Sequence, residues 1–575
     1  MKIPGQTIGT FPTLGFAWVH FLGALVLFHF FLAQSPSQEY IGFLNAYIAK
    51  ARGMFYEFFG FRAMLLAVII GAGAMAVSGL LGILPDRPRL EKLLKGLAVA
   101  MAAYAFLMML GYLANPNYID PGESHVTMLS LLVKEGKPVY SVLDNPDLAN
   151  TWYGPVLFLV NAVFLSVIPD PILATKLRGI VGLLAGLWFF HLFLSRRHGT
   201  PLSYVATSYV ILCLYLSFYF AIGNRADSLI ICFTLLAAGF STFADTRKGM
   251  WITAACIAAA VNCKVTAAAY MFPIGAYMVE THGWRPALRT TGLSMLLFFS
   301  PFLVFPLFPL HHYLSYISMA TSHRFETPLL WENIGFAAFI SLPLAWVLYP
   351  AFRDKADVRV PAMRMAGFTV LGIALVCLSA SKEGSGFYHL LAFSPGLALL
   401  WIHSASKEGS LAPGNASGVL AASWMYACLL LVMGNHLGLL YGFKLRGNHN
   451  PGEEIRAIVK EFPGERIAMG YGSSDDYGDT RLFYRPLLFN TTRDNPMNAV
   501  TMMEIISAGK PIPPLSCERF GNGHYDLFLI PAGGEPFSAS IFEDTGIQAL
   551  FRENYEKIGS REFFEVWRWK GAKAS

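Results

Sequence analysis

Apolar runs of about 20 residues recur along the chain as far as residue 441, separated by short polar segments. A helix needs about that many apolar residues to cross the ~30 Å hydrocarbon core of a bilayer. The pattern therefore predicts a polytopic α-helical membrane protein with about thirteen transmembrane helices. The expected spans are 13–34, 62–85, 94–114, 176–195, 202–222, 226–244, 250–263, 265–280, 287–308, 329–349, 364–380, 386–403 and 418–441.

The pattern changes after residue 441. Charged residues become frequent, turn-forming stretches such as 472–476 appear, and short strand-like runs such as 525–530 lie between them. We therefore expect two domains, a transmembrane domain over 1–441 and a small soluble α/β domain over 442–575.

Composition agrees with a membrane protein. Hydrophobic residues make up 55% of the chain and charged residues only 14%, whereas an ordinary soluble domain carries roughly 25% charged residues. The net charge of +6 is modest, and no Lys/Arg-rich run is present, so we expect no nucleic-acid partner. Six of the seven cysteines lie in apolar segments, which leaves no visible disulfide or metal framework.

Basic residues in short loops predict the orientation, because such loops stay in the cytoplasm. The strongest cluster is Arg353, Lys355, Arg359 and Arg364. All basic loops share one side only if the stretch 153–169 does not cross the membrane, and we expect a juxtamembrane helix or shallow hairpin there. The N-terminus is then cytoplasmic. The loop 115–175 and the C-terminal domain are extracytoplasmic.

Two carboxylates follow the third expected span. Asp120 and Glu123 flank Pro121 and Gly122, a turn that ends the span and starts a short helix of roughly 123–134. This helix is expected to lie along the membrane interface. A carboxylate at that boundary can act as general base toward a hydroxyl. Capping of the helix N-terminus is an equally good explanation for either residue.

Three further breaks between apolar runs carry charge. Arg225 and Asp227 lie in one of them and can form a catalytic pair or merely neutralise each other. Lys264 lies between two short apolar segments, where its side chain serves a site or only reaches for the interface. Lys382 and His389 belong to the loop 381–389, whose alternative is a plain connection.

A last polar loop, 309–328, contains three histidines and Arg324. The histidine spacing matches no compact ligand motif, so no metal site is expected. Together these loops supply acids and cations to one extracytoplasmic face, an arrangement that suits an anionic, membrane-borne substrate. Motifs of nucleotide-binding loops, Ser–His–Asp hydrolases and HExxH metalloproteases are absent from the sequence.

The order of these motifs resembles that of the GT-C superfamily of membrane glycosyltransferases over about residues 95–405. The most similar branch holds protein O-mannosyltransferases and the aminoarabinose transferase that modifies lipid A. The matching segments are the acidic motif 120–123, the Gly/Tyr-rich turns 134–140 and 152–155, the step 176–178, the Arg-x-Asp motif 225–227, the lysine at 264 and the stretch 384–391.

The resemblance implies transfer of a sugar from a polyprenyl-phosphate donor to a hydroxyl of a lipid, glycan or protein acceptor on the outer face, usually with inversion. It implies no cofactor, although some members of the superfamily use a divalent metal. The expected location is the bacterial inner membrane. The site residues that it implies are Glu123, Asp120 and Asp227 as catalytic residues, Lys264, Arg225 and Lys382 for the donor phosphate, and Tyr153, His389 and Arg324 for substrate.

Two questions stay open in the sequence. The acidic pair of the family is spread here over Asp120 and Glu123, so the base is not identified, although position relative to the following helix favours Glu123. The alternative function is a transporter or flippase of a lipid-linked or anionic substrate. A transporter more often shows internal repeats and charges deep in the bilayer, whereas the charges of this chain cluster at one face.

Overall fold

The computed structural model describes residues 87–142, 144, 150–215, 218–351, 356–382, 385–408, 450–475, 478–494, 499–511, 514–543 and 545–571. The expected spans 13–34, 62–85 and 418–441 lie outside these residues.

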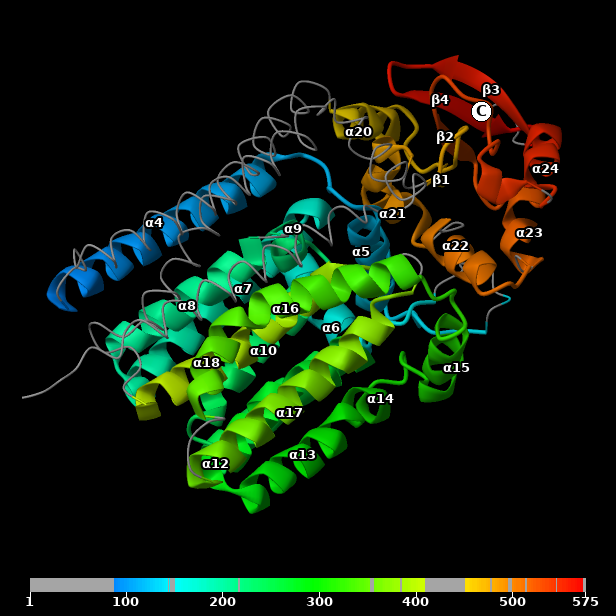
Figure 1. The fold of residues 1–575 in the computed structure, drawn as a ribbon. Coiled ribbons are helices and arrows are strands. Elements are labelled where there is room, and N and C mark those ends of the chain that lie inside the picture. Colours follow the sequence, from blue (N-terminus) through cyan, green and yellow to red (C-terminus); the bar gives the residue numbers. More distant parts are fainter. Residues whose placement is uncertain are drawn as a thin grey trace, which may run out of the picture.

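The apolar segments form helices, because every backbone polar group inside a bilayer must find its partner within its own segment. They run side by side in one bundle (Figure 1). The helices up to residue 304 are α4 (Arg87–Ala114), α5 (Pro121–Lys134), α6 (Pro155–Val167), α7 (Pro171–His198), α8 (Thr200–Tyr215), α9 (Phe218–Ile222), α10 (Ala226–Ser241), α11 (Arg247–Cys263), the 3₁₀ helix η2 (Val265–Met271), α12 (Phe272–His282), α13 (Trp284–Phe298) and α14 (Ser300–Val304). Those that follow are α15 (Leu310–Ala320), α16 (Thr327–Ala351), α17 (Ala356–Ser379), the 3₁₀ helix η3 (Phe387–Phe393) and α18 (Ser394–Glu408).

Three described stretches are long and apolar enough to cross a membrane, judged by length and composition: Pro171–His198, Trp284–Val304 and Arg359–Ser379. With the apolar composition, they make the chain a membrane protein. The stretch expected not to cross contains α6, whose 13 residues extend only about 20 Å. The full count of about thirteen spans stays a prediction.

Two expected spans do not begin as α-helices, which corrects the sequence-based expectation for 265–280 and 386–403. The first seven residues of each helical stretch form the 3₁₀ helices η2 and η3, and α-helix follows only from Phe272 and Ser394. A 3₁₀ helix is narrower and is used in short pieces, frequently at the ends of α-helices. The two 3₁₀ helices pack against each other. They therefore bring Lys264, just before η2, and His389, within η3, to the same part of the bundle.

Helix α5 also differs from its expected setting. The sequence predicted an amphipathic helix on the membrane interface, but its residues 121 and 123–133 are all buried. Helix α6 packs on one side of α5 and elements of the C-terminal domain on another. The hydrophobic residues of α5 are thus covered by protein.

The C-terminal part forms the expected α/β arrangement. Its four strands stand in the order β1-β2-β4-β3, with β1 parallel to β2 and the other neighbours antiparallel. The elements are α20 (Pro451–Glu461), β1 (Ile467–Met469), the 3₁₀ helix η4 (Thr480–Leu488), α21 (Phe489–Thr492), α22 (Ala499–Ser507), α23 (Leu515–Gly521), β2 (Leu527–Pro531), the 3₁₀ helix η5 (Ser540–Phe542), α24 (Ile547–Asn554), β3 (Tyr555–Ser560) and β4 (Phe564–Trp569).

This C-terminal domain sits at one end of the bundle, next to α5 (Figure 1). Its hydrophobic core continues into the membrane part, since Tyr118, Ile172 and Tyr316 belong to the same cluster of buried residues. A salt bridge of 2.9 Å from Arg456 to Asp170 joins the two parts at the surface. The C-terminal domain is therefore docked directly on loops of the membrane domain that carry candidate site residues.

Candidate active site

The site is organised around the short loop 223–225, between α9 and α10. The backbone of helix α7 packs directly against the backbone that leads into this loop. A Cβ added at Gly179 would lie 1.9 Å from the carbonyl oxygen of Ile222, the residue before the loop. The neighbouring residue Arg178 reaches under the loop. Its buried guanidinium donates to Asn161 Oδ1 at 2.7 Å, to Ser228 Oγ at 2.5 Å, and to Asn224 Oδ1. The acceptors are uncharged, so Arg178 fixes the loop through hydrogen bonds.

Asn224 connects this network to Glu123. Its backbone N–H donates to Glu123 Oε1 at 2.9 Å, and its side-chain amide donates to the Glu123 carbonyl oxygen at 3.0 Å. Glu123 also accepts hydrogen bonds from the Tyr112 hydroxyl and from the backbone N–H of Ile119 at 2.9 Å. The side chain is 0% exposed. Glu123 is thus a buried acceptor that ties the start of α5 to the loop 223–225.

Asp120 and Glu123 together form a capping box at the N-terminus of α5. Asp120 Oδ1 accepts from the Gly122 N–H at 2.8 Å and pairs with Arg225 Nη1 at 2.9 Å. Asp120 Oδ2 accepts only from the Tyr219 hydroxyl, at 3.1 Å, among the interactions that the described residues make. The side chain of Asp120 remains 10% exposed. Capping therefore occupies both carboxylates, but Asp120 keeps an oxygen with spare acceptor capacity.

Arg225 begins a chain of alternating charge. Its Nε lies 3.4 Å from Asp227 Oδ2, and Asp227 Oδ1 lies 3.4 Å from His389 Nδ1. Arg225 is therefore held between Asp120 and Asp227, two carboxylates from different elements. The side chains of Arg225, Asp227 and His389 are 13%, 7% and 7% exposed.

Aromatic rings surround the guanidinium of Arg225. The rings of Phe220 and Tyr388 are stacked, with their centroids 3.9 Å apart. The guanidinium carbon lies 4.8 Å from the Phe220 centroid and 5.3 Å from that of Tyr388, within cation–π range. The rings fix the orientation of Arg225 while its charge stays available beside Asp120.

The segment 152–154 places the rings of Trp152 and Tyr153 beside Lys264. Gly154 N–H donates to the Cys263 carbonyl oxygen at 3.0 Å, and a Cβ at Gly154 would lie 1.6 Å from the Asn262 carbonyl oxygen. Only glycine allows this approach. Lys264 Nζ then lies 5.9 Å from the ring centroids of both Trp152 and Tyr153. Burial raises the pKa of Tyr153 to about 12, so its hydroxyl stays protonated at neutral pH.

The Lys264 ammonium group makes no hydrogen bond or salt bridge with any residue in the part of the chain that the structure describes. Its neighbours there are the two rings; at longer range the Asp227 carboxylate attracts it and the Arg225 guanidinium repels it. The donors of this ammonium are therefore available to an anionic ligand.

The C-terminal domain adds Glu504, on α22. The Tyr316 hydroxyl donates to Glu504 Oε2, and His323 Nε2 lies 3.3 Å from the Glu504 carbonyl oxygen. Burial raises the pKa of this carboxyl from 4.5 to about 8, and the opposing effects of the Tyr316 hydrogen bond and of the Lys264 charge do not cancel it. A residue of the docked domain is thus coupled electrostatically to Lys264.

The structure brings six of the nine candidate residues together in one cluster. They are Asp120, Asp227, Arg225, Lys264, Tyr153 and His389. Glu123 lies behind them, in the network under the loop. Arg324 and Lys382 belong elsewhere. Arg324 is 79% exposed and pairs with Glu326, and Lys382 donates to the Thr321 carbonyl oxygen.

Sequence reasoning gave no role to Lys176, although it quoted the step 176–178. Lys176 Nζ donates to the carbonyl oxygens of Tyr112, Asn115 and Asn117, at 3.0, 2.7 and 2.6 Å. It thereby satisfies the backbone where α4 ends and the loop to Asp120 begins. A lysine inside an apolar run is costly unless it is paired, and that cost was the available signal.

Among the described residues, no three His, Cys, Asp or Glu side chains lie close enough together to hold a metal ion.

No family model and no curated protein matches the sequence. Solved structures do match the fold. ArnT from Cupriavidus metallidurans bound to undecaprenyl phosphate aligns with a TM-score of 0.51 at 15% identity, over 82% of this chain and 98% of that chain. The apo state of the same protein aligns at 0.49 with 14% identity, over 82% and 98%. The oligosaccharyltransferase of Archaeoglobus fulgidus in complex with zinc and sulfate aligns at 0.38 with 12% identity, over 80% and 71%.

Proposed function

We propose that this chain, which has the GT-C fold of ArnT, is a membrane glycosyltransferase that moves a sugar from a polyprenyl-phosphate donor to an acceptor hydroxyl on the extracytoplasmic face. One observation carries the proposal. Asp120, a carboxylate whose side chain is 10% exposed, is ion-paired to Arg225, and Lys264, a lysine without a described acceptor, lies near the same charged group. The ArnT structure with undecaprenyl phosphate supports a polyprenyl-phosphate ligand for this fold.

Lys264 and Arg225 are the proposed ligands of the donor phosphate. The Lys264 ammonium makes no hydrogen bond with a described residue and lies beside the rings of Trp152 and Tyr153. Charge-assisted hydrogen bonds to phosphate are about twice as strong as neutral ones. Charge that develops on the leaving phosphate would therefore be stabilised most by Lys264, with Arg225 as the second cation.

Asp120 is the proposed base, in preference to Glu123. The acceptor hydroxyl would give its proton to Asp120 Oδ2 while its oxygen forms a bond to the anomeric carbon of the sugar. The bond between that carbon and the phosphate oxygen breaks, and the lipid phosphate leaves with the electron pair. This single displacement inverts the anomeric centre. Glu123 is less suited, because its oxygens already accept hydrogen bonds from four separate donors and the side chain is 0% exposed.

The remaining residues act around this step. Asp227 orients Arg225 at its Nε, whereas Asp120 pairs with its Nη1, and His389 in turn contacts Asp227. Tyr153 forms part of the wall beside Lys264. We assign Lys382 and Arg324 no part in the transfer step. The proposed site opens on the extracytoplasmic side, as basic residues in the opposite loops predict, and the acceptor is a lipid, glycan or protein hydroxyl.

The test measures incorporation of labelled sugar from polyprenyl-phosphate donors into membrane acceptors by the purified chain. Asp120→Asn keeps the size of the side chain and should reduce transfer about 10²–10⁴-fold, the usual contribution of a general base. Glu135→Gln, an exposed carboxylate at the end of the same helix, is the matched control and should transfer normally.

Unchanged transfer by Asp120→Asn would overturn the assignment of the base. If no donor supports transfer by the wild-type chain although the chain binds a lipid-linked substrate specifically, the transporter or flippase becomes the better explanation.

A further inference from the structure

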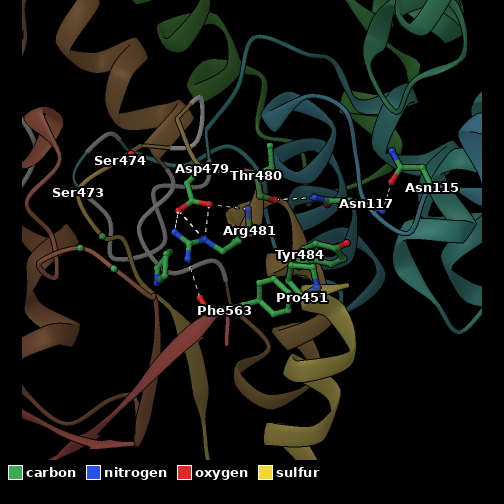
Figure 2. Close-up of a pocket in the computed structure, with 14 residues that line it drawn as sticks. Asn115, Asn117, Pro451, Ser473, Ser474, Asp479, Thr480, Arg481, Tyr484 and Phe563 are labelled. Carbon is green, nitrogen blue, oxygen red and sulfur yellow. Dashed lines mark hydrogen bonds and ion pairs between the residues drawn. The ribbon is translucent and has the colours of Figure 1, made fainter. Parts of the chain in front are cut away.

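A cavity lies outside this site, between the C-terminal domain and the loop that leads to Asp120. It has a volume of 490 Å³, within the range of small-molecule sites. Figure 2 shows Asp479 and Arg481 at its centre, with Asn115 and Asn117 approaching from the side of the membrane domain.

The cavity occupies the position where open α/β sheets usually bind ligands. Strands β1 and β2 are parallel, and the two loops that follow their carboxyl ends, 472–474 and 533–534, line the cavity. Ligands of open α/β sheets bind in the crevice outside the carboxyl ends of the strands. The loops are rich in glycine and serine, so a ligand can approach their backbone closely.

The charges of the cavity cancel. Arg481 Nη2 lies 2.6 Å from Asp479 Oδ2, and Arg481 Nη1 donates to the carbonyl oxygens of Ala532 and Phe563 at 2.8 and 3.1 Å. The guanidinium is therefore occupied by the protein, and the cavity offers no spare cation to a phosphate or carboxylate. Its other lining side chains are uncharged.

Polar and apolar groups both line the cavity. Serine hydroxyls and the Asn117 side chain supply hydrogen-bonding groups, while Tyr484, Pro451 and Phe563 supply apolar surface.

We propose that this cavity binds a neutral saccharide. Amides, hydroxyls and a carboxylate match the alternating donors and acceptors of sugar hydroxyls, and the aromatic and proline surface matches the apolar C–H faces of a sugar ring. Charge neutrality selects against sugar phosphates. The proposed saccharide is distinct from the polyprenyl phosphate proposed to bind at Lys264. The Lys264 ammonium has no described ion-pair partner, whereas Arg481 in this cavity is paired with Asp479.

The cavity is connected to the proposed base. Asn117 Nδ2 donates to the Thr480 carbonyl oxygen at 2.9 Å, and Lys176 holds the carbonyl oxygens of Asn115 and Asn117. Three residues after Asn117 comes Asp120. We assign the saccharide to the acceptor; this part rests on the proposed transferase function, whereas saccharide binding itself does not.

Binding is tested by isothermal titration of the full chain with maltose, cellobiose and glucose 6-phosphate, in a detergent without a sugar headgroup. A neutral disaccharide should bind the wild type, and glucose 6-phosphate should bind at least tenfold more weakly. Ser473→Trp places an indole in the cavity and should weaken binding at least tenfold. Ser560→Trp, at an exposed serine on β3 outside the cavity, is the matched control and should bind normally.

Failure of both disaccharides to bind the wild type, or equal binding by Ser473→Trp, would overturn the saccharide site whatever the result of the transfer assay. In that assay, a higher acceptor KM with an unchanged donor KM for Ser473→Trp supports the acceptor assignment. A higher donor KM instead would overturn it. If the wild type transfers nothing, the proposed function fails while the binding result still decides the cavity.

Discussion

Two groups of polar residues meet at the loop 223–225, and they differ in burial and in how completely their polar atoms are hydrogen-bonded. In the first group, Arg178, Asn224 and Glu123 are almost completely buried, and each makes hydrogen bonds with several partners. In the second group, the side chains of Asp120 and Arg225 are 10% and 13% exposed, and Asp120 retains acceptor capacity. Buried polar groups that are fully paired stabilise one conformation, whereas partly exposed and partly unpaired charges can bind and react. The comparison therefore separates a structural network from a chemical one within a few residues of sequence.

The largest expected effect breaks the structural network. Glu123→Ala removes an acceptor and leaves the Tyr112 hydroxyl and the backbone N–H groups of Asn224 and Ile119 buried without it. Breaking a buried charged network by removing one member costs about 3–5 kcal/mol. Chemical unfolding in detergent should show this loss, while Glu135→Ala, at an exposed position of the same helix, should unfold like the wild type. Normal stability with abolished transfer would instead make Glu123 a residue that acts on substrate.

The second prediction concerns the chemical network. Lys264→Met keeps the length of the side chain but removes the ammonium that faces Trp152 and Tyr153. Loss of a group that stabilises developing charge costs about 10²–10³-fold in rate, and we expect that decrease in kcat/KM for the donor. The free energy of unfolding should not fall, because no described residue pairs with the ammonium. Lys248→Met, at an exposed position near the other end of α11, removes the same charge and should transfer normally. Equal rates for both variants would exclude Lys264 from the donor site.

The third prediction compares two glycines of α7. A Cβ at Gly179 would lie 1.9 Å from the Ile222 carbonyl oxygen, whereas a Cβ at Gly182, almost one turn later, meets its nearest atom at 3.8 Å. Overpacking of this kind costs typically about 1–3 kcal/mol. Gly179→Ala should therefore destabilise the chain and reduce transfer together, because the loop 223–225 must move. Gly182→Ala should change neither thermal unfolding nor transfer. Equal behaviour of the two variants would mean that α7 does not position the loop.

The chemical network was largely predictable from sequence, because its residues carry charge where apolar runs break. Asp120, Arg225, Asp227 and Lys264 stand out since a charge beside hydrocarbon is costly. The fold class followed from the same runs, and the similarity to ArnT confirms the fold that the motifs implied. The positions of Arg324 and Lys382 outside the site could not be predicted, because a charge in a loop does not show in which direction its side chain points.

The structural network was not predictable in the same way. Asn161 and Asn224 are neutral, so their hydrogen bonds to Arg178 leave no charge pattern in the sequence. Sequence position favoured Glu123 as the base. In the structure, however, the Glu123 carboxylate accepts a hydrogen bond from the backbone N–H of Asp120 within the capping box. Contacts between distant segments, such as that between Tyr316 and Glu504, depend on how the two domains dock.

The smallest expected effect tests that docking through pH. Because burial raises the pKa of Glu504 to about 8 in the folded chain, the folded state holds a proton between about pH 5 and 8 that the unfolded state has released. Stability therefore falls as pH rises through this range. Glu504→Gln retains an acceptor for Tyr316 and cannot ionise, so its advantage over the wild type should grow by about 2 kcal/mol between pH 6 and 8. Unfolding curves at these two pH values measure it, with the exposed Glu556→Gln as control. A constant difference between wild type and variant would mean that Glu504 is ionised throughout, and that the α22 contact with Tyr316 is open to water.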